Sequence, residues 1–372
     1  MIFDAKSRTG TDPAKQSESY YSYLNRSARD DAGQIRDVIE EWAGLYPTAE
    51  HPNFIKKIKS ADDKIFLPAF FELYLYVLMK KLNVESVEIE PSVHGITTRP
   101  DFFAHFPLHQ DVYVEARCLS EDEGYLRQDN VITNIGERVD NKLKGNNLGL
   151  SMQWDGDPSN ADFSTKNLNE LIGWYKKLHQ DDVERRVEKL FEFDDWFIKF
   201  TVEGQINGDH RVVHAVMPQT ARIVTLDERL RSVLRKKGKK YGKLPQTLIL
   251  AVNIVDGTYE HQIHNAIFGN KAVEFNSQTR QLTNIRVGNG FWRGETKWHY
   301  TRVGAIIIAN KLNPWTIFSP DEKQVQIYHH PGLSVQTTPF DRLPVFKKNN
   351  KDTYDFYNGE SARSILGLPQ LD

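Results

Sequence analysis

The sequence predicts an α/β fold in which a mixed sheet is flanked by helices. One observation is an almost wholly apolar helical segment at residues 66–79, followed by strand-like runs at 84–91 and 111–119. A second is the presence of later apolar runs at 244–254 and 303–309, bounded by turn residues, which are typical of strands buried on both faces. Helices and strands that alternate in this way pack in layers around one sheet.

The segment at 66–79 is expected to form a buried helix. It is apolar almost all the way round, and Pro68 stands near its start, where a helix tolerates proline. Glu72 is its only acid, and no cation lies three or four positions away from it in the helix. A buried carboxylate is costly unless it is neutralised, hydrogen-bonded or metal-bound. We therefore expect Glu72 to find a partner elsewhere, and Asp101 and Glu115 are the nearest candidates.

The run at 111–119 is expected to be a strand that carries an acid and a cation on one face. Side chains alternate sides along a strand, so Glu115 and Arg117 point the same way. Pro100 and Asp101 precede Glu115 by a short interval. Two carboxylates that lie close together on a small sheet are the smallest set of side chains that we expect to bind a hard divalent cation.

The order of these features resembles the PD-(D/E)XK, or restriction-endonuclease-like, nuclease superfamily. The matching residues are Glu72 on a helix, Pro100-Asp101, Glu115 on a strand, and Arg117 in the place of the family's lysine. The resemblance covers about residues 65–120, and the same stretch is similar to a group of bacterial nuclease-like proteins of unassigned function. It implies a restriction-endonuclease-like mixed sheet with an N-terminal helical element and peripheral insertions.

The resemblance implies a metal-dependent endonuclease that hydrolyses phosphodiester bonds of nucleic acid, with DNA the expected form, in restriction, repair or phage defence. Asp101, Glu115 and Glu72 would bind Mg²⁺ or Mn²⁺, for which oxygen ligands are suited. Arg117 would complete the catalytic set by holding a phosphate oxygen with its planar guanidinium. Arginine does not readily lose a proton, so a general base would have to come from Lys142, Lys144 or another cation.

Two other interpretations stay open. Arg117 also favours a catalytically inactive nuclease-like module that binds nucleic acid without cutting it. In a third interpretation, the acids form a buried structural network and no nucleic acid is involved.

A basic segment is the second candidate functional feature. It has eight cations in fifteen residues and no acid between Arg229 and Lys243. Such cations repel one another unless an anion is nearby, so the pattern favours a phosphate-binding surface over a solvated helix face. The candidate residues are Arg229, Arg231, Arg235, Lys236, Lys237, Lys239, Lys240 and Lys243.

Two weaker motifs are interpreted structurally. His261 and His264 lie three apart on an expected helix, but no carboxylate pattern accompanies them, so they are expected to be polar or helix-end residues rather than metal ligands. The stretch 290–302 interleaves aromatic residues with cations, a combination that serves either base stacking or packing. Packing is the favoured role.

Composition bounds the remaining expectations. The net charge of -2 over 372 residues argues against a wholly cationic surface, and the single Cys118 excludes an internal disulfide. No apolar run is long enough to span a bilayer and the first residues lack a secretory stretch, so the cytoplasm is the expected location, without a membrane partner. A homodimer and a partner subunit of a larger system both remain open.

Three parts are expected along the chain. Residues 1–60 form an N-terminal helical element, residues 61–335 the nuclease-like core with an insertion near 146–210, and residues 336–372 a peripheral C-terminal tail.

Overall fold

The chain forms two compact units in the computed structural model. The structure describes residues 1–15, 18–107, 109–120, 123–156, 163–193, 196–206, 212–215, 226–242, 244–276, 280–294, 296–333, 338–348 and 354–369. The larger unit comprises Met1–Asp12, Ser19–Ser120 and Thr225–Asp372, and the smaller one comprises Pro13–Glu18 and Glu121–Val224.

The larger unit is built on a mixed sheet that has eight strands among the described residues, in the order β1-β2-β3-β8-β11-β12-β13-β14. The central strands β3, β8 and β11 are parallel neighbours, whereas β1, β2 and β3 pair antiparallel. The strands are β1 (Ser86–Ile89), β2 (Phe102–His105), β3 (Val112–Leu119), β8 (Thr247–Ile254), β11 (Val303–Asn310), β12 (Val325–His329), β13 (Val345–Lys348) and β14 (Tyr354–Tyr357). The predicted mixed α/β architecture is thus confirmed.

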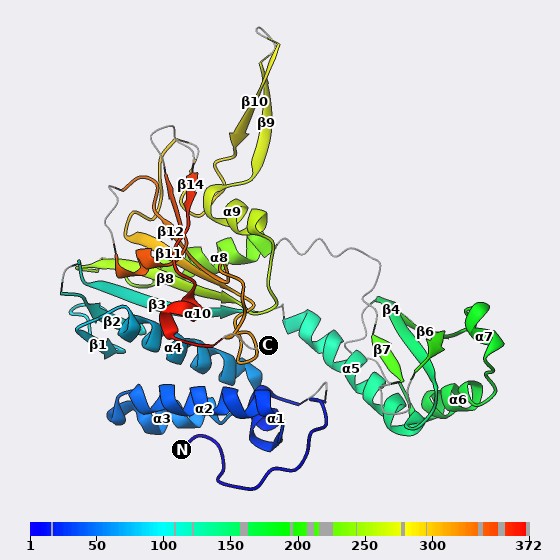
Figure 1. Cartoon of the computed structure of the whole chain (residues 1–372). Helices are drawn as coiled ribbons and strands as arrows, with labels where there is room; N and C mark the ends of the chain where they lie inside the picture. The colour runs from blue at the N-terminus through cyan, green and yellow to red at the C-terminus, as the bar shows by residue number, and fades with distance from the viewer. Residues whose placement is uncertain are drawn as a thin grey trace. The chain divides into compact units, whose positions relative to one another are not determined.

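Helices cover both faces of this sheet (Figure 1). The helix α4 (Asp63–Lys81) packs on one face, and α8 (Leu226–Lys240) and α9 (Glu260–Phe268) pack on the other. In β8, Ile249 belongs to the core on the α4 side, whereas Leu250 belongs to the core on the α8 side. This two-sided burial explains why the strand is apolar at nearly every position.

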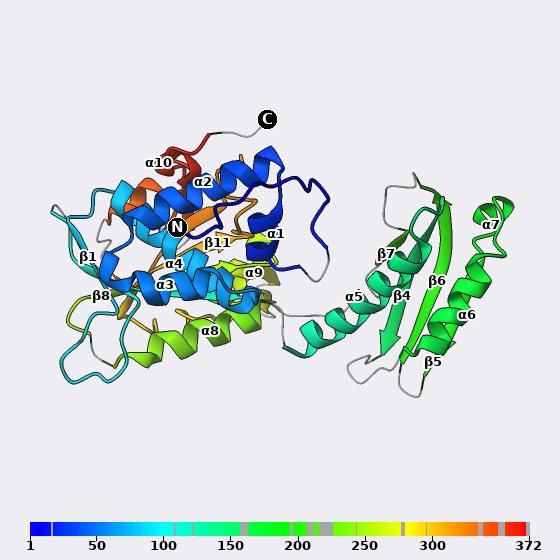
Figure 2. The ribbon, with the colours of Figure 1, turned by 90° about the horizontal axis from the view of Figure 1, so that it is seen from below.

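The helix α4 is the buried helix that the sequence predicts. It begins at Asp63, after Asp62 accepts a hydrogen bond from the N–H of Lys64 at 2.9 Å, so Pro68 lies inside the helix rather than at its start. The N-terminal helices and α10 pack against it, and Figure 2 shows α3 running beside it. They are α1 (Tyr20–Arg26), α2 (Asp30–Leu45), α3 (His51–Ile58) and α10 (Ala362–Leu366), and the short η1 (Thr48–Glu50) leads into α3.

No helix in the described ranges is both long and apolar enough to cross a membrane.

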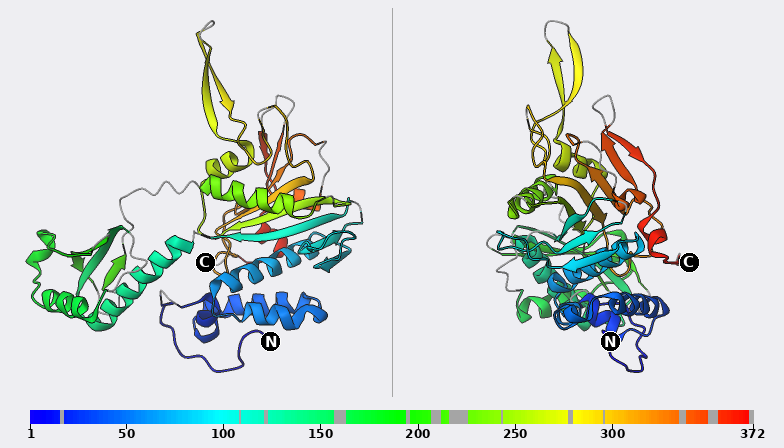
Figure 3. Two further views of the ribbon diagram at one scale, coloured as in Figure 1. Left: turned by 180° about the vertical axis from the view of Figure 1, so that it is seen from behind. Right: turned by 90° about the vertical axis from the view of Figure 1, so that its left-hand side faces the viewer.

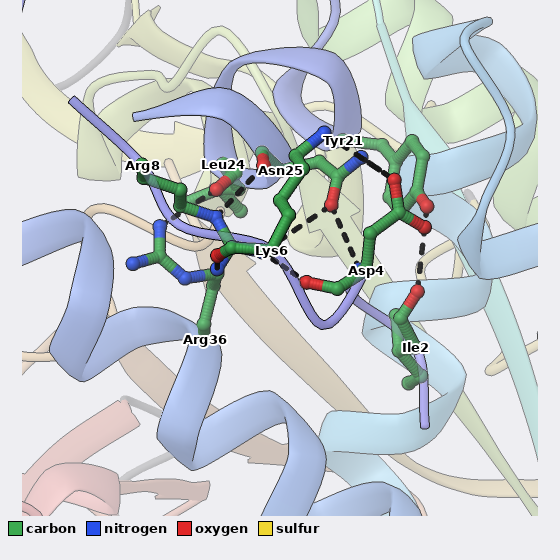
Figure 4. A network of polar contacts seen from close by, with 8 residues as sticks. All are labelled: Ile2, Asp4, Lys6, Arg8, Tyr21, Leu24, Asn25 and Arg36. Atoms are coloured by element: carbon green, nitrogen blue, oxygen red, sulfur yellow. Dashed lines mark hydrogen bonds and ion pairs between the residues drawn. The ribbon is translucent and has the colours of Figure 1, made fainter. Parts of the chain in front are cut away.

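The first residues are tied to the N-terminal helices by a polar network (Figure 4). Asn25 donates from Nδ2 to Oδ2 of Asp4 at 2.8 Å, and Arg8 donates from Nε to the carbonyl oxygen of Asn25 at 2.8 Å. The N–H of Ile2 donates to Glu40 at 2.6 Å, and the Ile2 side chain is buried. The N-terminal segment is therefore part of the helical layer.

The C-terminal residues extend the sheet. Strand β13 pairs parallel with β12, and β14 pairs antiparallel with β13. Phe346 of β13 is buried in the core on the α8 side. Residues 345–348 and 354–357 thus lie within the sheet and not in the peripheral tail that the sequence predicts.

A two-stranded hairpin of β9 (Lys271–Asn276) and β10 (Gln281–Arg286) follows α9. Both views of Figure 3 show it extending away from the eight-stranded sheet.

The smaller unit has a core of its own around a sheet in the order β5-β6-β4-β7. Its elements are α5 (Glu123–Leu143), β4 (Leu148–Gly156), α6 (Thr165–Tyr175), α7 (Asp181–Glu184), β5 (Glu188–Glu192), β6 (Trp196–Gln205) and β7 (Val213–Ala215). The longer segment of this unit, Glu121–Val224, includes α5, which precedes the insertion predicted near residues 146–210.

Candidate active site

Asp101 and Glu115 come together where β2 separates from β3. Phe102, the first residue of β2, pairs with Val114 of β3. Beyond this pair β2 no longer covers β3, so the N–H of Ala116 is open on that side. It donates to Oδ2 of Asp101 at 2.6 Å. This bond holds the Asp101 carboxylate against the backbone of the residue that follows Glu115.

Glu115 is 1% exposed and is surrounded by polar side chains from the end of α8. Its Oε1 accepts from the ammonium groups of Lys237 and Lys240, the latter at 3.1 Å, and its Oε2 accepts from the hydroxyl of Tyr241. The Tyr241 hydroxyl oxygen also lies 3.0 Å from the carbonyl oxygen of Arg99. Tyr241 therefore connects β3 to the turn that carries Asp101, and the two cations neutralise a carboxylate that would otherwise be costly to bury.

The helical repeat explains how Lys237 reaches Glu115. Leu230 and Leu234 are the fully buried leucines of α8, and both pack in the core on that side of the sheet. Lys237 follows Leu234 at a spacing of three residues, so these three side chains lie on one stripe of α8, and Tyr241 comes directly after the last residue of the helix. The stripe faces the sheet.

Arg117 does not take part in this cluster. It lies two residues beyond Glu115 on β3 and is exposed, and within the described ranges it makes no hydrogen bond or ion pair. The cation beside Glu115 is therefore Lys237, which comes from a helix and not from the same strand.

The charges of the site act strongly on Asp101. Burial, then the charges of Glu115 and Glu72, raise the pKa of Asp101 to about 7, while the Ala116 N–H and Lys237 oppose the rise. Around Asp101, the negative charge of the acids thus exceeds the positive charge of the nearby cations.

Glu72 lies beside a cavity on the α4 side of the sheet. The cavity has a volume of about 400 Å³ and is lined by residues of α3, α4, β1 and β2, which include Lys57 and Glu72, and by Asp101, which directly precedes β2. Lys57 Nζ lies 3.8 Å from Oε2 of Glu72, so the partner that the sequence required is a cation from α3. Burial raises the pKa of Glu72; Lys57 opposes this shift, and Glu90 and Glu115 add to it.

The three predicted metal ligands do not form one ligand set. Glu115 does not line the cavity, because its side chain is buried under α8, whereas Glu72 comes from α4 on the opposite face. Across the described ranges, no group of three or more His, Cys, Asp or Glu side chains is gathered closely enough to hold a metal ion. Asp101 instead interacts electrostatically with both of the other acids, since the charges of Glu115 and Glu72 raise its pKa.

Glu90 is a further acid at the cavity that the sequence analysis missed. It follows β1 with a φ of +46°, a left-handed conformation that few residues other than glycine adopt. Its N–H donates to the carbonyl oxygen of Asp101 at 2.9 Å. No sequence motif marks this position, because its role depends on the pairing of β1 with β2.

The donor chemistry fits a hard divalent cation at Asp101. The carboxylate oxygens are the right ligand type, and the repulsion among Asp101, Glu115 and Glu72 is what a bound cation relieves. Among the described residues, the only hydrogen bond to the Asp101 carboxylate is the one from Ala116. Glu115 fits such a cation only if it gives up part of its contact with the lysines.

The basic segment does not form one surface. Arg231 is 7% exposed and is held by Asp227 and by Asn270, each at 3.1 Å, so it is an internal residue. Because a helix turns by about 100° per residue, the seven cations that belong to α8 point to different sides of it. Lys237 and Lys240 contact Glu115, Arg229 and Arg235 donate to backbone carbonyls, Lys236 and Lys239 are exposed, and Lys243 lies outside the described residues.

The weaker motifs have packing roles. The His264 ring is 4.8 Å from the Phe346 ring, and burial followed by nearby cations lowers the pKa of His264 to about 4. Phe291 and Trp292 are fully buried, so the packing interpretation of the stretch 290–302 is confirmed for these two residues.

Comparison with known proteins found no matching family model, no matching curated protein and no matching solved structure. The functional proposal therefore depends on the chemistry of the site.

Proposed function

We propose that the chain is a metal-dependent nuclease of the PD-(D/E)XK type that hydrolyses phosphodiester bonds of nucleic acid, with DNA the expected substrate. The observation that carries this proposal is the hydrogen bond from the N–H of Ala116 to Asp101, which holds the Asp101 carboxylate against the backbone next to Glu115, where β2 leaves β3. A mixed sheet with α4 on one face and α8 on the other is compatible with the restriction-endonuclease-like fold.

Asp101 and Glu115 would hold Mg²⁺ or Mn²⁺. Such an ion supplies a Lewis acid and a bound water of lowered pKa. Glu72 and Glu90 line the cavity beside Asp101 and are placed to accept hydrogen bonds from a water there. Tyr241 holds the Glu115 carboxylate in place through its hydroxyl.

Lys237 takes the role that the superfamily's lysine has on the strand. Its ammonium group lies against Glu115, whereas Arg117 is exposed and makes no contact with that acid. An ammonium group at this position stabilises negative charge that develops on a phosphate oxygen. The presence of Arg117 in the place of the superfamily's lysine therefore does not by itself argue against catalysis.

The exposed cations of α8 are proposed to contact the phosphate backbone. Lys236 and Lys239 are exposed, and Arg235 is exposed with one contact to the carbonyl oxygen of Asn289 at 3.1 Å. Such contacts are independent of sequence and weaken as salt increases. Arg231 is left out of this surface because it is buried.

A second candidate function is a nucleic-acid binding module that does not cut. The saturation of Glu115 by Lys237, Lys240 and Tyr241 favours it, since a carboxylate with three donors is less available to a metal. This module would bind nucleic acid equally well with and without a divalent cation.

Nuclease activity is tested by incubating supercoiled plasmid and labelled single-stranded DNA and RNA with the protein in Mg²⁺, Mn²⁺ or EDTA. The proposal predicts cleavage in both metals and none in EDTA. Salt-sensitive binding without cleavage in any condition would favour the binding module.

A further inference from the structure

Two ammonium groups share a single oxygen of Glu115. Lys237 and Lys240 both donate to Oε1, while Oε2 accepts from Tyr241. A buried carboxylate needs about one countercharge, yet here two cations contact one acid. Glu115 by itself is therefore contacted by one cation more than its own charge requires, although Asp101 and Glu72 add negative charge nearby.

The two lysines are not equivalent. Lys237 lies within α8, on the stripe that faces the sheet, and its side chain is 21% exposed. Lys240 is the last residue of α8, its Nζ lies 3.1 Å from Oε1, and its side chain is 33% exposed. The Lys240 Nζ is also 4.8 Å from the centre of the Tyr241 ring. Lys240 can leave the carboxylate and still rest on the face of this ring.

We propose that Lys240 is a removable countercharge, and that a hard divalent cation binds Asp101 and Glu115 only when Lys240 leaves Glu115. Lys237 and Tyr241 keep their contacts with the acid. This inference rests on the proposed function, because it takes the two acids as the metal ligands. Magnesium and manganese ions are the class of ligand concerned, since both prefer carboxylate oxygens.

The exchange has a clear electrostatic reason. A divalent cation at Glu115 would lie close to two ammonium groups, and like charges at such distances repel strongly away from bulk water. The departure of Lys240 removes one of these repulsions and frees a lone pair of Oε1. In the absence of metal, Lys240 instead compensates the charge of Glu115, whose Oε1 it contacts at 3.1 Å.

The test is a calorimetric titration of the full chain with MgCl₂ and with MnCl₂, comparing wild type with Lys240→Met. The variant keeps the length of the side chain and removes its charge. Its affinity for each metal is expected to rise about tenfold, the change that corresponds to about 1.4 kcal/mol. Lys236→Met is the matched control, because Lys236 is an exposed lysine of the same helix; its metal affinity is expected to change less than about twofold, as expected for screened surface charge.

Equal or weaker metal affinity in Lys240→Met, or absence of metal binding in both proteins, would overturn the exchange. Melting temperatures in EDTA provide an independent readout, because Lys240→Met should melt below wild type without metal and recover when metal is added. The two proposals fail separately. If wild type cleaves nucleic acid but Lys240→Met binds metal with unchanged affinity, only the proposed exchange is wrong. If Lys240→Met binds metal more tightly but wild type does not cleave nucleic acid, only the proposed nuclease activity is wrong.

Discussion

The ammonium group of Lys237 donates to Oε1 of Glu115, although the two residues are 122 positions apart in the chain. The cation that contacts Glu115 thus comes from a distant helix and not from β3, and Arg117, two residues further along the strand, is exposed. The proposed catalytic cation comes from α8, the helix that covers the opposite face of the sheet from α4.

Replacement of Lys237 tests this assignment. Lys237→Met should lower the cleavage rate by about 10²–10³-fold, since it removes a charge-stabilising group from the site. Arg117→Met should change the rate only a few-fold, because Arg117 is exposed and contacts no acid. Initial rates of plasmid nicking in Mg²⁺ measure both. If Arg117→Met loses activity and Lys237→Met retains it, the catalytic cation is Arg117 on β3 and not Lys237.

The raised pKa of Asp101 predicts how stability depends on pH. A folded-state pKa of about 7, above the ordinary value of 3.8, means that the native state binds the proton more tightly than the unfolded state. Without metal, this residue therefore contributes a loss of stability as pH rises from about 4 to about 7. Asp101→Asn removes the buried charge and keeps an acceptor for Ala116, so the variant should be more stable than wild type by about 1–3 kcal/mol at pH 8.

Urea unfolding in EDTA at pH 4 and pH 8 measures this difference, which should be largest at pH 8. Glu322→Gln, at an exposed acid, is the control and should show no such trend. If Asp101→Asn is instead less stable than wild type at pH 8, the acids form a structural network and not a strained metal site.

Tyr241 offers a prediction about positioning. Tyr241→Phe keeps the buried ring but removes the donor to Glu115 and the contact with Arg99. The variant should lose about 1–2 kcal/mol of stability, and its cleavage rate should fall while its affinity for substrate stays unchanged. Tyr259→Phe, at a residue that is 74% exposed, is the matched control. A normal rate in Tyr241→Phe would contradict the positioning role.

The cations of α8 should separate into two classes. Lys236→Ala and Lys239→Ala should weaken binding to all nucleic-acid sequences alike and reduce the salt dependence by about one ion each. Arg231→Met should instead unfold the protein more easily, by about 3–5 kcal/mol, because it leaves Asp227 buried without its partner. Fluorescence anisotropy across a salt series and thermal melts make the distinction. Equal effects of all three changes on binding would contradict it.

The sequence predicted the elements that carry a strong local pattern. The apolar helix around Glu72 and the buried strands β8 and β11 were recognisable because burial on all sides requires apolar residues at every position. The closeness of Asp101 to Glu115 followed from their spacing around a strand pair. The strands β13 and β14 have no strong local pattern, because they are short and carry charged residues; β14 forms the edge of the sheet and β13 lies next to it.

The site itself was less predictable. Lys237 belongs to a run of eight cations, and only its place four residues before Tyr241 and three after Leu234 distinguishes it. Glu90 has no distinguishing neighbour, since the pairing of β1 with β2 brings it to Asp101. Contacts between distant segments of this kind are set by the tertiary structure.

The most direct test of the central claim is the rate of plasmid nicking in Mg²⁺ by wild type and by Asp101→Asn, with both proteins shown to be folded by their melting transitions. The account predicts that wild type cuts and that Asp101→Asn loses activity by about 10²-fold or more. Equal rates in the two proteins, or no cutting by wild type, would contradict it.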